Sequence, residues 1–179
     1  MVQTISLHRL LQEAVATPYR NLVTRATGAA VRGRIEASLA AGVGHTTLLD
    51  FSGVECLDMS CADEIVAKLL LAAANGDRVL VLAGVREEQR EALEHVLAHH
   101  RLAVAACFRG LEAPDVLGWI SGDARLVFAD LRVGGPADLL TLADRLSWSV
   151  ERAAVALDEL TQHRIARRAA GVFHPVTLP

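Results

Sequence analysis

Three short apolar runs, separated by stretches with helical spacing, constrain the fold of this chain most strongly. The runs are TTLLDF (46–51), RVLVLAG (78–84) and LAVAAC (102–107). Such continuous apolar runs are typical of strands buried inside a sheet. Helical stretches at 60–74 and 86–100 connect them, and a strand–helix–strand connection is right-handed and joins parallel strands. The pattern predicts an α/β fold with a mainly parallel sheet and covering helices.

The segment before these runs carries two amphipathic stretches. The first predicted helix spans 5–16 and ends before Pro18, and the second spans 27–42 with Gly42 as its C-cap. In the second helix Arg32 and Glu36 are spaced to pair. No apolar run approaches the about 18 residues that a membrane span needs, and an acidic residue comes too early for a secretory signal. We therefore expect a cytoplasmic protein without a membrane partner.

The C-terminal third changes character. Periodicity weakens after the third run, so we predict a domain over 1–110, a linker over 111–122 and a second domain over 123–179. That second domain is expected to contain helices at 123–133, 139–146 and 149–164, followed by two short extended pieces around a glycine-containing turn. Three helices and a terminal hairpin predict a small helix-turn-helix unit with a wing.

The segment LLDFSGVECLDMSC (48–61) carries a family resemblance. Residues 46–107 resemble the STAS family, named for sulfate transporters and anti-sigma factor antagonists. Asp50 ends the strand, Asp58 opens the loop, and Ser60 holds the position that is phosphorylated in the antagonists. The family's first Ser and its Gly are replaced by Met59 and Cys61. The resemblance implies a STAS-like regulatory protein that contacts a kinase, an anti-sigma-like protein or another regulator.

Residues 123–179 are similar to the winged helices of many bacterial regulators. Such domains bind either DNA or protein. The whole chain is therefore expected to be a STAS-like domain followed by a small winged helix-turn-helix domain.

Ser60 has two explanations from the sequence. The segment SCAD places Ser60 three residues before Asp63, which is close to a capping box and would contribute about 1 kcal/mol. Alternatively Ser60 is a phosphorylation switch, since the start of a helix also favours a phosphate. The switch would act on a modestly acidic surface with Asp50, Asp58, Asp63 and Glu64, in which Glu64 and Lys68 point outward.

Catalytic and metal sites are not expected. Asp50 and Asp58 could form an acid–base pair, but no nucleophile–base pair accompanies them, so we predict no enzyme and no cofactor. Cys56, Cys61 and Cys107 lack a CxxC spacing. His95 and His99 are spaced at i, i+4 without an HExxH motif, which favours a solvated helix end over a metal site.

DNA binding is the alternative from another functional class. The chain carries a net charge of −3, and residues 123–179 hold seven arginines against seven acidic residues. Phosphate-driven binding needs several uncompensated cations. The candidate contacts are Arg152 in the third helix and Arg164, Arg167 and Arg168 in or before the wing. The charge balance favours a protein partner, and the oligomeric state stays open.

Overall fold

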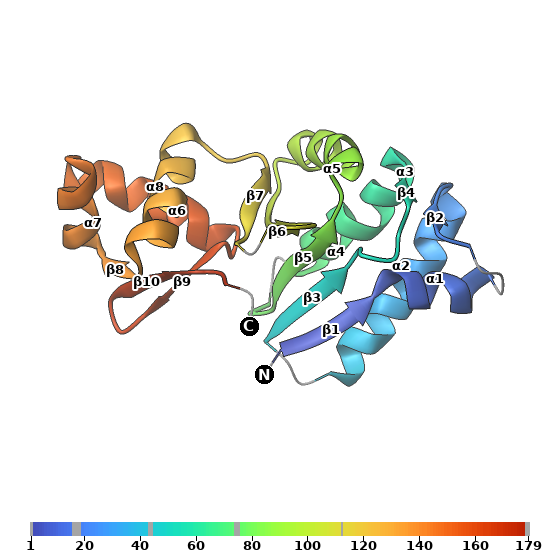
Figure 1. The fold of residues 1–179 in the computed structure, drawn as a ribbon. Coiled ribbons are helices and arrows are strands. Elements are labelled where there is room, and N and C mark those ends of the chain that lie inside the picture. Colours follow the sequence, from blue (N-terminus) through green and yellow to red (C-terminus); the bar gives the residue numbers. More distant parts are fainter. Residues whose placement is uncertain (1, 16–18, 43–44, 74–75, 112, 178–179) are drawn as a thin grey trace.

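The computed structural model of the chain describes residues 2–15, 19–42, 45–73, 76–111 and 113–177. It is a mixed α/β fold built around a five-stranded sheet. The strands lie in the order β1 (Val2–Ser6), β3 (Thr46–Asp50), β5 (Val79–Val85), β6 (Ala103–Phe108) and β7 (Asp115–Gly118). The first four strands are parallel and β7 is antiparallel to β6 (Figure 1). The prediction of a mainly parallel sheet is confirmed.

The sheet has one strand more at each edge than the apolar runs indicate. At the N-terminus, β1 occupies the first part of the predicted helix, so α1 covers only Leu7–Val15. At the other edge, β7 lies inside the stretch 111–122 that was predicted as a linker. The linker prediction is therefore wrong for 115–118, because these residues pair with β6 and bury Val116 and Leu117.

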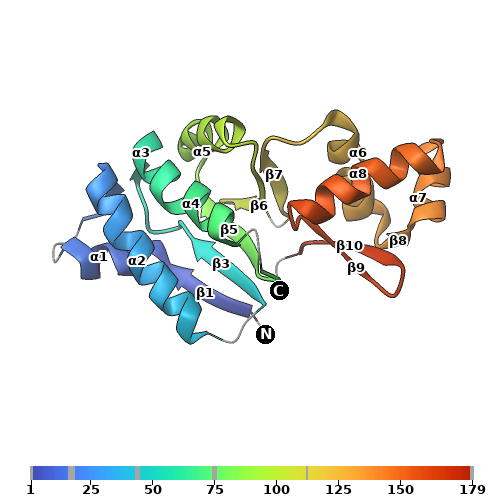
Figure 2. The ribbon, with the colours of Figure 1, turned by 180° about the vertical axis from the view of Figure 1, so that it is seen from behind.

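The remaining helices of the first half cover one face of the sheet (Figure 2). They are α2 (Arg25–Ala41), the continuous run of α3 (Met59–Ala62), η1 (Asp63–Ala67) and α4 (Lys68–Ala73), and α5 (Glu87–His99). A two-strand pair of β2 (Asn21–Leu22) and β4 (Cys56–Leu57) joins the start of α2 to the start of α3. Gly42 is the C-cap of α2, as predicted.

The second half has its own core. It contains α6 (Gly122–Gly134), β8 (Ala137–Asp138), α7 (Leu139–Leu146), α8 (Val150–Gln162), β9 (Ala166–Ala169) and β10 (Val172–Pro175). The three strands form an antiparallel sheet in the order β8-β10-β9. The three predicted helices and the terminal hairpin are confirmed, and the strand β8 is added to them.

The two halves meet along the β7 edge of the central sheet (Figure 1). The apolar core of the second half includes Ala103 of β6 and Val116 of β7. Their neighbours Val104 and Leu117 belong to the core under the helices of the first half. Alternate side chains of these strands thus serve two cores, as the pleat of a strand requires.

Candidate functional site

The turn that leads into α3 is organised by Asp58. Asp58 is the N-cap of α3, and its Oδ1 accepts the N–H of Cys61 at 2.7 Å. Its Oδ2 accepts the N–H of Thr24 at 3.0 Å. Thr24 has φ 74°, a region that a β-branched residue rarely adopts, so this bond holds a strained residue at the start of α2. Burial acts to raise the pKa of Asp58, but the N–H groups of Cys61 and Thr24 bring that pKa below its ordinary value.

Ser60 lies in the first turn of α3 and is not the cap. Its hydroxyl donates a hydrogen bond to Oδ1 of Asp58 at 2.8 Å. The predicted capping box with Asp63 is wrong, since Asp58 already accepts the N–H that a cap must satisfy and Asp63 bonds to other helices. Ser60 is half-buried, and the neighbouring Met59 side chain is 54% exposed. The hydroxyl therefore lies beside an exposed apolar side chain at the end of a helix.

Helices α2 and α3 approach each other closely behind this turn. A Cβ on Gly28 would lie 3.0 Å from Cβ of Glu64 and 3.2 Å from Cα of Cys61, so a larger residue would push these helices apart by a few tenths of an ångström. Cys61 is buried, and its Sγ donates to the carbonyl of Thr24 at 3.0 Å. Burial, followed by the charge of Asp58, raises the pKa of Cys61 to about 12, so it is not a reactive thiolate.

The helix that follows contains a π turn, for which the sequence carries no clear signal. In η1 the N–H of Lys68 donates to the carbonyl of Asp63, five residues earlier, and four successive residues are buried: Glu64, Ile65, Val66 and Ala67. Four buried residues in a row do not fit the apolar stripe of an α-helix. The prediction that Glu64 points outward is therefore wrong, and its exposed fraction is 3%.

Glu64 is the centre of a set of paired charges that we name the charge cluster: Arg25, Arg32, Asp63, Glu64, Lys68 and His100. Glu64 accepts hydrogen bonds from Lys68 at 2.6 Å, from Arg32 at 3.0 Å and from Arg25 at 3.1 Å. Arg32 also pairs with Glu36 at 2.7 Å, as predicted. The cluster joins α2 to η1 and α4 beside the first turn of α3.

Asp63 extends the cluster to α5. It pairs with Arg25 at 2.9 Å and with Nε2 of His100 at 2.7 Å. Burial acts to raise the pKa of Asp63, and the hydrogen bonds from Arg25 and His100 bring it below its ordinary value. The pKa of Glu64 is lowered chiefly by the hydrogen bond from Lys68.

The surface around Ser60 is consequently not the acidic patch that the sequence predicted. Asp63 and Glu64 are neutralised by the cations of the charge cluster, and the arginines among these partners come from α2, 32 to 39 residues away in the chain. Asp50 lies elsewhere, at the end of β3, where Oδ1 accepts the N–H of Ser52 at 2.9 Å. Within the described ranges no hydrogen bond joins Asp50 to Asp58, and each carboxylate binds backbone N–H groups of its own loop or helix start.

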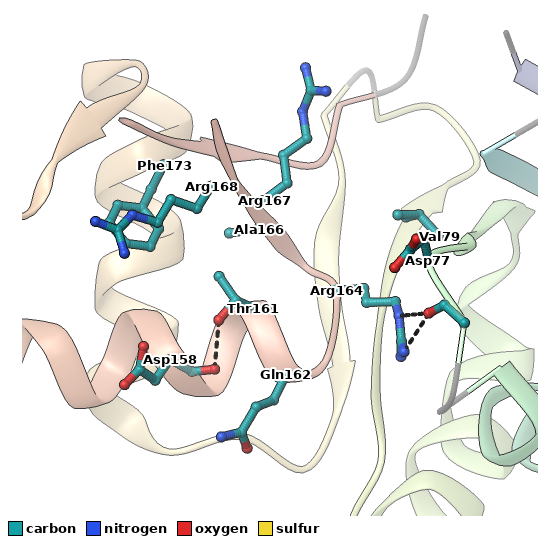
Figure 3. A pocket seen from close by; sticks show the side chains of 11 residues that line it. Asp77, Val79, Asp158, Thr161, Gln162, Arg164, Ala166, Arg167, Arg168 and Phe173 are labelled. Atoms are coloured by element: carbon teal, nitrogen blue, oxygen red, sulfur yellow. Dashed lines mark hydrogen bonds between the residues drawn. The ribbon is translucent and has the colours of Figure 1, made fainter. Parts of the chain in front are cut away.

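The candidate DNA contacts of the second half separate into two kinds. Arg152 is held by two hydrogen bonds of 2.8 Å to Asp123 and lies 4.0 Å over the Trp148 ring. Arg164 donates Nε and Nη2 to the carbonyl of Gly76, at 3.0 Å and 2.7 Å (Figure 3). Arg167 and Arg168, both exposed on β9, make no hydrogen bond or ion pair with any described residue. Of these four candidates, Arg167 and Arg168 are the two without a described hydrogen-bond or ion-pair partner.

Three histidines lie in the last turns of α5 and at its C-cap. His95 and His99 are exposed on α5, and the rings of His99 and His100 meet edge to face at 5.0 Å. Where the chain is described, no group of three or more His, Cys, Asp or Glu side chains could hold a metal ion. Of the helices described, none combines the length and apolar character that crossing a membrane requires.

Comparisons of the chain with protein-family models, with curated proteins and with solved structures found no match. The geometry of the chain itself therefore carries the functional argument.

Proposed function

We propose that this chain is a regulatory protein that acts by protein–protein contact through the first turn of α3, and that phosphorylation of Ser60 switches the contact. In this proposal the first half is a STAS-like domain. The observation that carries it is the bond from Ser60 to Asp58: Ser60 lies at the helix start without being its cap. Asp58 supplies the helix cap and the Ser60 hydroxyl binds that cap residue, so a modification of Ser60 would act directly on the start of the helix.

A phosphate on Ser60 would change this turn strongly. The hydroxyl proton that now binds Oδ1 of Asp58 would be lost, and a charge of about −1.5 to −2 would face the same carboxylate. At about 6 Å and an effective dielectric of 20 the repulsion is about 3 kcal/mol per unit charge, and less where water screens it. Asp58 would then release the N–H groups of Cys61 and Thr24, which lie at the starts of two different helices. A local modification would thus shift the surface that a partner contacts.

The position in the fold supports a contact site. The turn comes after β4 in the connection that leaves the carboxyl end of β3, and open α/β sheets place their sites at the carboxyl ends of parallel strands. Met59, 54% exposed beside Ser60, offers an adaptable apolar side chain to a partner. The charge cluster fixes the helices beneath this turn and so provides a rigid support for it.

In this proposal the second half is a winged helix that binds a protein partner. Three helices with an antiparallel sheet in the order β8-β10-β9 suit that fold. The helix that would enter a DNA groove is α8, whose arginine is bound to Asp123. Its exposed face carries Glu151, Val155 and Asp158, which suits a protein partner better than a phosphate backbone.

The test uses the full chain as bait in affinity capture from its native lysate, with Ser60→Ala and Ser60→Asp compared by quantitative mass spectrometry. We expect Ser60→Ala to retain a partner that Ser60→Asp loses, while circular dichroism shows both variants folded. Ser52→Asp, an exposed serine in the connection between β3 and β4, is the matched control and should retain the partner. Equal capture by both Ser60 variants would refute the switch.

DNA binding remains the second candidate because Arg167 and Arg168 are exposed and unpaired on β9. We expect weak, sequence-independent binding at most. Fluorescence anisotropy with random duplexes at low and moderate salt measures it. Sub-micromolar affinity at about 150 mM salt that is lost in the Arg167→Ala/Arg168→Ala variant would favour a DNA-binding regulator instead.

A further inference from the structure

A hollow of about 690 Å³ lies where the two halves of the molecule meet (Figure 3). One wall is the segment that leads into β5, from Gly76 to Val79, and the other is formed by the last turns of α8, by β9 and by Phe173 of β10. Cavities of about 300–1,000 Å³ are typical of small-molecule sites. The hollow is therefore large enough for an organic ligand.

The rim of the hollow carries the two unpaired arginines. Arg167 and Arg168 are neighbours on β9, and the guanidinium of Arg168 lies 5.5 Å from the centroid of the Phe173 ring. In Figure 3 the two side chains extend away from each other at the edge of the hollow. The two side chains leave opposite faces of β9, but both residues line the hollow and no hydrogen bond or ion pair to a described residue restrains either, so each can reach an anion at its edge.

The rest of the lining suits the body of such an anion. Val79, Ala166 and Phe173 supply apolar surface, and Phe173 and Ala166 are themselves buried. The carboxylates of Asp77 and Asp158 lie at opposite sides of the hollow and form no ion pair with a described residue, so they can accept hydrogen bonds from ligand hydroxyls. The lining thus combines cations for an acid group, an apolar surface and two acceptors.

The hollow also bridges the two halves. Arg164 forms part of its lining and binds the carbonyl of Gly76, so one wall is tied directly to the other. A ligand held between β9 and the start of β5 would contact both halves at once and would stabilise the junction.

We propose that this hollow is a binding site for a small organic phosphate with an apolar body, held by Arg167 and Arg168 and sandwiched between the two halves. The site is separate from the Ser60 surface, so it stands or falls independently of the phosphorylation switch.

The experiment uses isothermal titration calorimetry on the full chain with three probes: phenyl phosphate, inorganic phosphate and phenol. Phenyl phosphate should bind with a dissociation constant on the order of 1 mM or below. Inorganic phosphate should bind more weakly because it lacks the apolar body, and phenol should not bind measurably because it lacks the charge. Each of Arg167→Gln and Arg168→Gln should weaken phenyl phosphate about tenfold through the lost charged hydrogen bond.

Two further variants locate the ligand. Val79→Phe fills the apolar wall and should weaken phenyl phosphate while leaving inorganic phosphate unchanged. Arg101→Gln is the matched control, because Arg101 is also an exposed arginine over an aromatic ring, 5.9 Å from that of Trp119. It should bind like the wild type. Hydrogen exchange at residues 76–79 and 164–168 should slow when phenyl phosphate is present.

Equal binding by the wild type and Arg167→Gln/Arg168→Gln, or no binding of phenyl phosphate to a folded wild type, would overturn the proposal. So would tight binding of duplex DNA that Val79→Phe leaves unchanged, because the arginines would then serve a nucleic-acid backbone instead of the hollow. Circular dichroism of every variant separates these outcomes from unfolding.

Discussion

The charge cluster of the first half and the two arginines of β9 use the same chemical groups in opposite ways. In the charge cluster Arg25 and Arg32 bind Glu64, which is 3% exposed, and together with Lys68 they tie helices that are distant in the sequence. On β9, Arg167 and Arg168 are exposed and contact no described carboxylate. The charges of the cluster are occupied in holding the fold, whereas those on β9 are available to a ligand.

The difference shows that the number of charges in a segment does not indicate its function. What matters is whether each charge has an internal partner and how much water reaches it. A buried carboxylate with three cationic partners leaves little field for an external molecule. Two exposed guanidinium groups beside a hollow keep their electrostatic field available to an external molecule. The following predictions test this contrast, from the largest effect to the smallest.

The largest effect is expected from Glu64→Ala. The substitution leaves three cations without their common partner and creates a space between α2 and η1, so the free energy of unfolding should fall by about 3 kcal/mol. Glu36→Ala is the matched control, because Glu36 also pairs with Arg32 but its side chain is 44% exposed. It should cost less than about 1 kcal/mol in urea denaturation. Equal losses of unfolding free energy in the two variants would show that burial does not determine how much an ion pair of the cluster contributes to stability.

Acid should act on the same cluster, with a smaller effect because a protonated carboxyl keeps some of its hydrogen bonds. The pKa values of Asp63 and Glu64 lie below their ordinary values of 3.8 and 4.5, so the folded state binds these protons less readily than the unfolded chain. Their contribution to stability should be complete above about pH 5 and be lost as the pH falls below about 4. Urea denaturation at several pH values should show a shallower acid loss in Asp63→Asn than in the wild type. Parallel curves would contradict this assignment.

The sequence was most informative where one apolar pattern repeats. The runs that became β3, β5 and β6, and the helices between them, follow from local periodicity, so the parallel sheet was predictable. The strand β1 was hidden because VQTIS leads without a break into the apolar stripe of α1. The strand β7 was hidden because a four-residue strand between Pro114 and Trp119 resembles a loop until its partner β6 is known.

The site was less predictable because its partners are distant in the chain. The sequence placed Ser60 at the start of the helix and Asp58 in the loop before it, but which of them caps the helix depends on the backbone of the turn. The burial of Glu64 depends on the π turn and on arginines from α2, neither of which a local pattern reveals. Arg167 and Arg168 were identified as a basic cluster, whereas the hollow beside them exists only because residues 76–79 lie opposite.

An intermediate effect separates the cap from the switch residue at α3. Asp58→Ala removes the N-cap and the acceptor that holds Thr24, so unfolding should become about 1–2 kcal/mol easier. Ser60→Ala removes one hydrogen bond and leaves the cap in place, so it should cost less than about 1 kcal/mol. Thermal denaturation of both variants measures the difference. A larger loss in Ser60→Ala would make Ser60 a structural residue and weaken the proposed switch.

The smallest effect is expected on β9, and it completes the contrast with the charge cluster. Arg167→Ala should change the free energy of unfolding by less than about 0.5 kcal/mol, because the side chain is exposed and has no described partner. Arg168→Ala should cost slightly more, since its guanidinium lies 5.5 Å from the centre of the Phe173 ring, and an exposed contact of this kind contributes about 0.5–1 kcal/mol. Urea denaturation with and without phenyl phosphate measures the stability of each variant and the stability that the ligand adds. Without the ligand the variants should resemble the wild type, and with it only the wild type should gain substantial stability. A loss in either variant as large as that of Asp58→Ala, in the absence of ligand, would mean that β9 also uses its arginines to hold the fold, and the two regions would then not differ in kind.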